Sequence, residues 1–191
     1  MLISLLDLQR EPVRFDLGLD PGVIDFGEEA AQVSPLAVHG EAELLREHRG
    51  PREIVEDIRV RAHWQGDFQV PCARCLDPVR HALGGDFDLL FRPLGADSGP
   101  AERALGAPDT EIGYYQEDSL ALEDVLREQV LLSLPARTLC RPDCKGLCPR
   151  CGRNRNTEAC ACEDSPSDPR WSSLSDLRSQ LSPGNEKPLP K

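Results

Sequence analysis

Long apolar segments are missing from this chain of 191 residues. No stretch approaches the roughly 20 consecutive apolar residues that a membrane-spanning helix needs. The N-terminal sequence MLISLLDLQREPVRFDLGLD has no basic region, and its apolar run stops at Asp7, too early for a secretory signal peptide. We therefore expect a cytoplasmic protein without a membrane partner, in a compartment where thiols stay reduced.

Patterns that carry catalysis are missing as well. The sequence has no glycine-rich phosphate loop and no paired-carboxylate motif. Its histidines are scattered and come with no nucleophile pattern; they are His39, His48, His63 and His81. His63 lies in the polar register of a predicted strand, so we interpret it as a surface histidine. The sequence therefore predicts that the protein is not an enzyme.

Aromatic residues are few, at 5% of the chain, whereas 17 prolines and 15 glycines indicate many turns. Apolar and polar residues alternate between 58 and 64, as in a half-buried strand. The apolar members are Ile58, Val60, Ala62 and Trp64. Gly66-Asp67 predicts a turn, FQVPC a returning strand, CARC a second turn, and FDLLF a further strand. With shorter apolar runs in 1–20 and 33–48, these segments predict an antiparallel sheet.

A helix is predicted over SLALEDVLREQVLLSLP, residues 119–135. Its apolar residues recur at helical spacing on one face, at Leu122, Val125, Leu126 and Val130. Ser119 is the expected N-cap, and Pro135 ends the helix. The predicted fold class is α+β: a mostly antiparallel β domain with one or two short helices and a C-terminal cysteine-rich zinc knuckle.

The expected organisation has three parts. Residues 1–135 form the β domain, which ends in the helix and contains a small-residue linker at about 95–110. Residues 136–181 form the cysteine-rich segment. That segment includes a short docking helix that begins at Asp168 and Pro169 and packs through Trp171, Leu174 and Leu177. Residues 182–191 are expected to be a disordered tail.

The chain has eight cysteines, in four close pairs. They are Cys72 and Cys75, Cys140 and Cys144, Cys148 and Cys151, and Cys160 and Cys162. A structural zinc ion takes four ligands, so four pairs predict two sites and two zinc ions. The favoured pairing joins the first two pairs in one site and the last two in a compact knuckle. The alternative places Cys144, Cys148, Cys151 and Cys162 on one ion.

Other uses of the cysteines are open at this point. A disulfide framework is disfavoured because we expect a reducing compartment. The CPRC sequence resembles a thioredoxin-type redox pair, but Gly152 and further cysteines follow it where such a motif opens a helix. An iron–sulfur cluster also accepts four thiolates. Closed four-thiolate zinc sites have no vacant position for water, which again indicates a structural role.

Charge is unevenly distributed in this acidic chain of formal charge −11. Residues 137–155 contain six basic residues and one acidic residue. The formal charge of this segment is therefore +5, and that of the rest of the chain is −16. The candidate RNA- or partner-binding residues of this basic segment are Lys145, Arg150, Arg153, Asn154, Arg155 and Asn156. Arginine can clamp phosphates and stack on bases. The alternative is that these arginines solvate a loop and offset the thiolate charge.

The cysteine pattern resembles a known family. The segments CARCLDP, LSLP, CRPDCKGLCPRCGRNRN, CAC and DPRWSSL are similar to the large ribosomal RNA subunit accumulation protein family of YceD type. The resemblance covers roughly residues 54–181, and the string from Cys144 to Asn156 is its most specific part. A branch of the family keeps the first C-x-x-C and lacks the distal cysteines, which implies two separable sites. The acidic, lysine-poor composition and the insertion at 95–110 depart from the pattern.

The resemblance implies a bacterial, non-enzymatic factor that supports accumulation of large-subunit ribosomal RNA. The basic segment favours a large-subunit ribosomal RNA precursor as the partner, whereas the −16 remainder favours a basic ribosomal protein. The competing hypothesis is a metal- or thiol-dependent redox protein that uses the C-x-x-C pairs.

Overall fold

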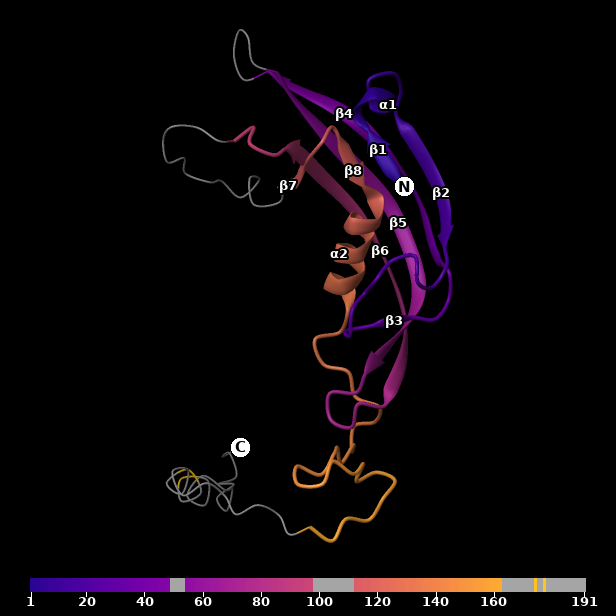
Figure 1. The fold of residues 1–191 in the computed structure, drawn as a ribbon, viewed down its shortest axis with the longest axis vertical. Coiled ribbons are helices and arrows are strands. Elements are labelled where there is room, and N and C mark those ends of the chain that lie inside the picture. The colour runs from indigo at the N-terminus through magenta and orange to yellow at the C-terminus, as the bar shows by residue number, and fades with distance from the viewer. Residues whose placement is uncertain (49–53, 98–111, 163–173, 175–176, 178–191) are drawn as a thin grey trace, which may run out of the picture. The chain divides into compact units, whose positions relative to one another are not determined.

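The computed structural model describes residues 1–48, 54–97, 112–162, 174 and 177 (Figure 1). The chain divides into two compact units, Met1–Gly146 and Leu147–Lys191. The first contains, in chain order, β1 (Leu2–Ser4), α1 (Leu5–Leu8), β2 (Val13–Leu19), β3 (Ala31–Gln32), β4 (Leu36–His48), β5 (Ile54–Pro71), β6 (Pro78–Pro93), β7 (Ile112–Tyr115), β8 (Ser119–Ala121) and α2 (Leu122–Ser133).

The main sheet has the strand order β2-β4-β5-β6-β7, with β3 paired to β5 (Figure 1). Its pairs are antiparallel except β6 and β7, which run parallel. A separate antiparallel pair joins β1 to β8. The predicted mostly antiparallel β structure with one or two short helices is confirmed, although α1 lies in a segment predicted to form a strand. The parallel pair was not predicted, because periodicity within a strand carries no information on its direction relative to a neighbour.

The predicted turn at Gly66-Asp67 is wrong, because β5 continues through it to Pro71. Opposite this point, β6 stays in register, with Asp67 facing Ala82. A Cβ placed on Gly66 would lie 3.2 Å from a Leu36 methyl and 3.3 Å from the Phe68 ring. The glycine therefore permits close packing inside a long strand. The second predicted turn, at CARC, is where β5 reverses into β6.

The core lies on one face of the main sheet, which α2 covers (Figure 1). All four helix residues predicted to face the core are buried. The alternating apolar residues of β5 are buried on the same face. Trp64 packs edge-on against Phe68, at 6.4 Å between ring centroids. Burial of this apolar face is the main favourable contribution to the fold.

The predicted N-cap role of Ser119 is wrong, because Ser119 opens β8 and the helix begins three residues later. Glu117 and Asp118 have φ of 53° and 52°, the backbone of a tight two-residue hairpin turn that reverses β7 into β8. Gln116 and Ser119 pair across this turn. Ala121 occupies the N-cap position and makes no side-chain cap.

The opposite face of the sheet carries charged side chains in cross-strand pairs. Arg59 donates to both carboxylate oxygens of Asp88, and Arg61 donates to Glu41 at 2.7 Å. His63, predicted to be a surface residue, is partly exposed and lies 2.9 Å from Asp86. Pairing of opposite charges across strands makes this polar face compatible with the sheet.

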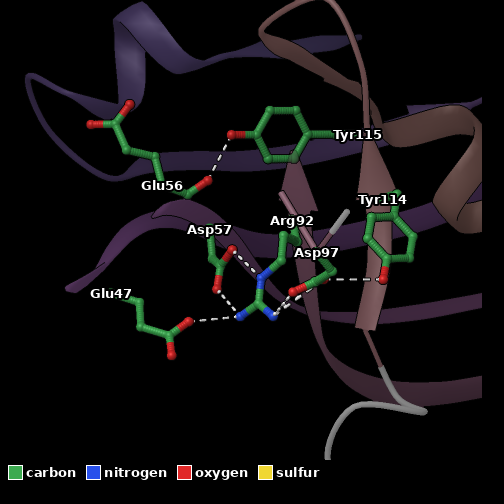
Figure 2. Close-up of polar contacts among 7 residues, drawn as sticks. All are labelled: Glu47, Glu56, Asp57, Arg92, Asp97, Tyr114 and Tyr115. Carbon is green, nitrogen blue, oxygen red and sulfur yellow. Dashed lines mark hydrogen bonds and ion pairs between the residues drawn. The ribbon is translucent and has the colours of Figure 1, made fainter. Parts of the chain in front are cut away.

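At one end of the sheet, an arginine is buried among carboxylates (Figure 2). Arg92 is 4% exposed, and its guanidinium contacts Asp57, Asp97 and Glu47 at 2.9–3.2 Å. Its hydrogen bonds to Asp57 raise the pKa of Arg92 above its usual range. Asp57 is itself buried, so each of these two charges depends on the other.

Arg92→Met is expected to lower the free energy of unfolding by about 3–5 kcal/mol, because it leaves the Asp57 carboxylate buried without a partner. Arg92→Met/Asp57→Leu should recover most of that loss. The control is Arg59→Met, which breaks a more exposed pair and should cost less than about 1 kcal/mol. Urea denaturation measures the free energy of unfolding of all three variants. If Arg92→Met and Arg59→Met lowered it equally, the proposed dependence of Asp57 and Arg92 on each other would be contradicted.

Several predicted segments fall outside the described residues. They are most of the linker at 95–110, most of the helix that begins at Asp168, and the tail at 182–191. Leu174 and Leu177 have helical backbone, with side chains 53% and 48% exposed. Within the described part of the chain, no helix is long and apolar enough to cross a membrane.

Candidate metal centres

The eight cysteines gather into two groups of four. The first tetrad is Cys72, Cys75, Cys140 and Cys144, and the second tetrad is Cys148, Cys151, Cys160 and Cys162. Within each, the four sulfur atoms lie within 4.8 Å of one another. These are the two sets of the pairing that the sequence favoured, and each tetrad is positioned to bind a metal ion.

The first tetrad joins two distant parts of the sheet unit. Cys72 and Cys75 lie in the turn between β5 and β6, and Cys140 and Cys144 follow α2. The sulfur of Cys72 lies 3.9 Å from that of Cys144, and the sulfur of Cys75 lies 3.5 Å from that of Cys140. Three of the four residues are buried, Cys140 being the exception. The site is therefore shielded from solvent on most sides.

Backbone hydrogen bonds hold these two segments together beside the sulfurs. Ala73 donates its N–H to the carbonyl of Thr138 at 2.8 Å. The guanidinium of Arg74 donates to the carbonyl of Cys144 at 2.7 Å. Arg74 was not among the residues predicted for the site. Its only signal in the sequence was its place between two cysteines.

The second tetrad is built from a short local segment. The sulfur of Cys160 lies 3.3 Å from that of Cys148 and 3.6 Å from that of Cys151. Only Cys148 is buried, and Cys151 is exposed. Cys148 donates its N–H to Arg153 at 2.8 Å, and Leu147 pairs with Asn154, so the segment forms a miniature hairpin.

The two C-x-x-C turns have the same backbone geometry. In each, the residue after the second cysteine donates its N–H to the carbonyl of the first cysteine at 2.9 Å. That residue is Leu76 in the first turn and Gly152 in the second, with φ of 64° and 71°. The left-handed backbone suits glycine, whereas it costs a residue with a Cβ about 1–2 kcal/mol. Leu76 is thus a strained position, and its side chain is 63% exposed.

This turn geometry changes the acidity of the first cysteine in each turn. Burial by itself would raise the pKa of the Cys72 thiol, but N–H donors from Arg74, Cys75 and Cys140 outweigh it and lower the pKa to about 6. N–H donors from Cys151 and Arg150 likewise lower the pKa of Cys148 to about 6. Each turn therefore favours a thiolate, which is the form that binds metal.

Burial or neighbouring cysteines raise the pKa values of three further thiols. Burial raises the pKa of Cys75 and of Cys140. Hydrogen bonds with Cys160 and Cys151 raise the pKa of Cys162 to about 12. A group of four adjacent sulfurs without a cation therefore holds protons, and a divalent cation would replace them.

The sulfur spacing fits a single ion. Tetrahedral zinc with Zn–S bonds of about 2.3 Å places its sulfurs about 3.8 Å apart, close to the 3.3–3.9 Å found in the two tetrads. An iron–sulfur cluster distributes its four thiolates over two or four irons, so thiolates on different irons lie further apart. All eight residues are thiols, so the sulfurs are not paired as disulfides.

The predicted partner-binding residues are divided between the two units. Lys145 lies at the end of the first unit, whereas Arg150, Arg153, Asn154, Arg155 and Asn156 lie in the second. Arg150 and Arg153 are exposed. The side-chain oxygen of Asn154 accepts hydrogen bonds from the backbone and the side chain of Asn156, at 3.0 and 2.8 Å. The two asparagines thus stabilise their own turn.

These features define a small, mostly antiparallel β protein with two four-cysteine sites, one long-range and one local. The family model described as "Large ribosomal RNA subunit accumulation protein YceD" matches residues 60–178, and the chain belongs to this family. The matched range contains all eight cysteines and the basic segment.

Curated relatives are similar over part of their length. An uncharacterized protein of Mycobacterium tuberculosis is 36% identical over 107 residues, which cover 56% of this chain and 48% of that protein. An uncharacterized protein of Mycobacterium leprae is 28% identical over 125 residues, covering 65% of this chain and 54% of the relative. The chain thus spans about half the length of these relatives.

A plant relative carries a descriptive name. It is the maize protein "Large ribosomal RNA subunit accumulation protein YCED homolog 1, chloroplastic", 27% identical over 115 residues, which cover 48% of this chain and 39% of the maize protein. No solved structure matches the chain significantly.

Substitution of one cysteine from each tetrad should separate the two sites. Cys72→Ser is expected to remove about one bound metal ion per chain and to destabilise the sheet unit, because metal binding to the first tetrad contributes to its folding. Cys160→Ser should remove the other ion while the sheet unit stays folded. Metal analysis together with the near-ultraviolet circular dichroism of the aromatic residues checks both. Loss of the sheet signal in Cys160→Ser, with metal content unchanged in Cys72→Ser, would contradict the grouping.

Proposed function

We propose that this protein is a non-enzymatic factor that supports the accumulation of large-subunit ribosomal RNA. The observation that carries the proposal is the family match over residues 60–178, which includes both tetrads and the basic segment. The name of the maize relative supports the same process. In this proposal the tetrads are structural, and the second one presents a basic loop to RNA.

Zinc is the metal proposed for both sites. Four thiolates and no other ligand make a closed tetrahedral set, which Zn²⁺ prefers in structural sites. Bound zinc would join the β5–β6 turn to the segment after α2 and would fix the loop of the second tetrad. Such a metal contributes free energy of folding and does not take part in a reaction.

RNA contact is proposed for the exposed arginines of the second unit. Arg150 lies inside the C-x-x-C turn, and Arg153 accepts the N–H of Cys148 at its carbonyl, so the backbone at both positions is fixed by the miniature hairpin. A loop already ordered loses little conformational entropy on binding. Arg153 also lies 3.8 Å from Glu158, an exposed pair that is weak enough to exchange for a phosphate.

The redox alternative has less support. A thiol-dependent redox protein needs an accessible thiol with a lowered pKa. Cys72 and Cys148 have lowered pKa values, but both side chains are buried. The lowered pKa values serve metal binding equally well.

Protein purified without added metal is expected to contain two zinc ions per chain and no visible-absorbing chromophore. Four cysteines gather at each of two places, and zinc has no visible transitions in such sites. Elemental analysis with an absorption spectrum is the measurement. One zinc ion per chain, or a brown iron-containing product, would contradict two zinc sites.

Changing Arg150, Arg153 and Arg155 to Glu should weaken binding to large-subunit ribosomal RNA and flatten its salt dependence. Each lost phosphate contact should reduce the slope of log K against log salt by about 0.7–0.9. Zinc content should stay at the wild-type value. The measurement is filter binding or fluorescence anisotropy across a salt series.

A matched control changes three arginines of the sheet unit, Arg10, Arg14 and Arg46, to Glu. It alters the net charge equally and should leave the salt slope nearly unchanged. Equal loss in both triple variants would show that net charge alone governs binding. Unaltered RNA binding, together with unaltered ribosomal RNA accumulation in cells, would remove the basic loop from the proposal. If the partner is a basic protein, its binding should instead be weakened when acidic residues of this chain are neutralised.

A further inference from the structure

A groove runs along the solvent side of α2 in the sheet unit. One hollow of about 430 Å³ lies between the helix and the segments β1, β7 and β8. A second hollow of about 470 Å³ adjoins it and extends toward the end of the helix. Asp124 and Glu128 line both hollows. We call this surface the α2 groove and define it by Leu2, Tyr114, Ala121, Asp124, Glu128 and Leu132.

The groove exposes large apolar side chains. Leu2 is 69% exposed at one end, and Leu132 is 72% exposed at the other. Tyr114, which lines the same hollow as Leu2, is 48% exposed. Buried Leu120 and Val125 form part of the floor. Apolar side chains gathered in a hollow of this kind are typical of a surface that contacts another molecule.

The groove also carries two carboxylates and one cation, because Arg127 lines the second hollow together with Asp124 and Glu128 and donates to the carbonyl of Asp25. Asp124 and Glu128 lie one helical turn apart, and neither side chain has an ion pair or hydrogen bond to any described residue. A hollow of about 810 Å³ on the polar face of the sheet is different. Its carboxylates are matched by cations, as in the pairs of Glu41 with Arg61 and of Asp88 with Arg59. The α2 groove therefore combines exposed apolar surface with an excess of negative charge, two carboxylates to one arginine.

We propose that the α2 groove docks a basic polypeptide segment of a partner protein, with lysine or arginine facing Asp124 and Glu128 and apolar side chains beside Leu2 and Leu132. Nucleic acid is disfavoured because its phosphates would meet these carboxylates. A two-fold contact between copies of this chain would place the same acids against each other. None of the residues that define this surface belongs to the proposed RNA-binding loop or to either tetrad.

The probe is a 12-residue peptide of alternating lysine and leucine pairs, titrated into the full-length protein with its metal bound. Two matched peptides replace leucine by serine or lysine by glutamate. The lysine–leucine peptide should bind at least ten times more tightly than either, because it supplies both charge and apolar contact. Backbone amide shifts in the ¹⁵N-labelled chain should be confined to the residues of the groove.

Asp124→Asn/Glu128→Gln and Leu132→Ser should each weaken the peptide at least tenfold. The control, Asp16→Asn/Glu28→Gln, removes the same charge from exposed positions outside the groove and should bind like wild type. The proposal would be overturned if the lysine–serine peptide bound as tightly as the lysine–leucine peptide, or if the amide shifts lay outside the groove. It would also be overturned if the control variant lost as much affinity as the groove variants. A further contradicting result would be that the free protein sediments as a dimer and that the groove variants abolish this dimer. None of these outcomes bears on RNA binding by the arginine loop.

Discussion

The meeting of two chain segments at the first tetrad is the constraint on which the sheet unit depends. The β5–β6 turn supplies Cys72 and Cys75, and the segment after α2 supplies Cys140 and Cys144, so 64 residues lie between the inner two cysteines. Closing a loop of that length restricts the unfolded chain, and the gain in stability grows with loop length. The same closure fixes the exit of α2, whose apolar face covers the sheet.

The two faces of the main sheet differ in the side chains that they carry, and this difference accounts for the packing of the rest of the unit. One face is apolar and lies under α2, and the other carries charges paired across neighbouring strands. This pairing lets an acidic chain build a long sheet without leaving like charges adjacent. Arg92 applies the same principle inside the protein, where Asp57 must be matched because water cannot reach it. On α2, by contrast, the side chains of Asp124 and Glu128 form no ion pair with any described residue, although Arg127 lines the same hollow.

Local patterns in the sequence were enough for several elements. Alternation at Ile58, Val60, Ala62 and Trp64 predicted a half-buried strand, and helical spacing from Leu122 to Val130 predicted a helix with a buried face. The cysteine spacing predicted two groups of four. Each of these signals is a short-range periodicity or a count, and the physical property behind it is burial on one face or the number of ligands that an ion takes.

The structural features that the sequence did not predict depend on tertiary contacts. Gly66 resembled a turn residue, but Leu36 and Phe68 pack over it and the strand continues. Ser119 resembled a helix cap, but its pairing with Ser4 draws it into β8. The contribution of Arg74 to the first tetrad requires the Cys144 carbonyl, 70 residues away. Sequence spacing carries no information on such partners.

The most direct test of the central claim, that one metal joins the β5–β6 turn to the segment after α2, is NMR of protein in which ¹¹³Cd replaces the native metal. Two cadmium signals are predicted. One should correlate with the β-protons of Cys72, Cys75, Cys140 and Cys144, and the other with those of Cys148, Cys151, Cys160 and Cys162. A cadmium signal that correlates with Cys144 and Cys148 together would contradict the claim.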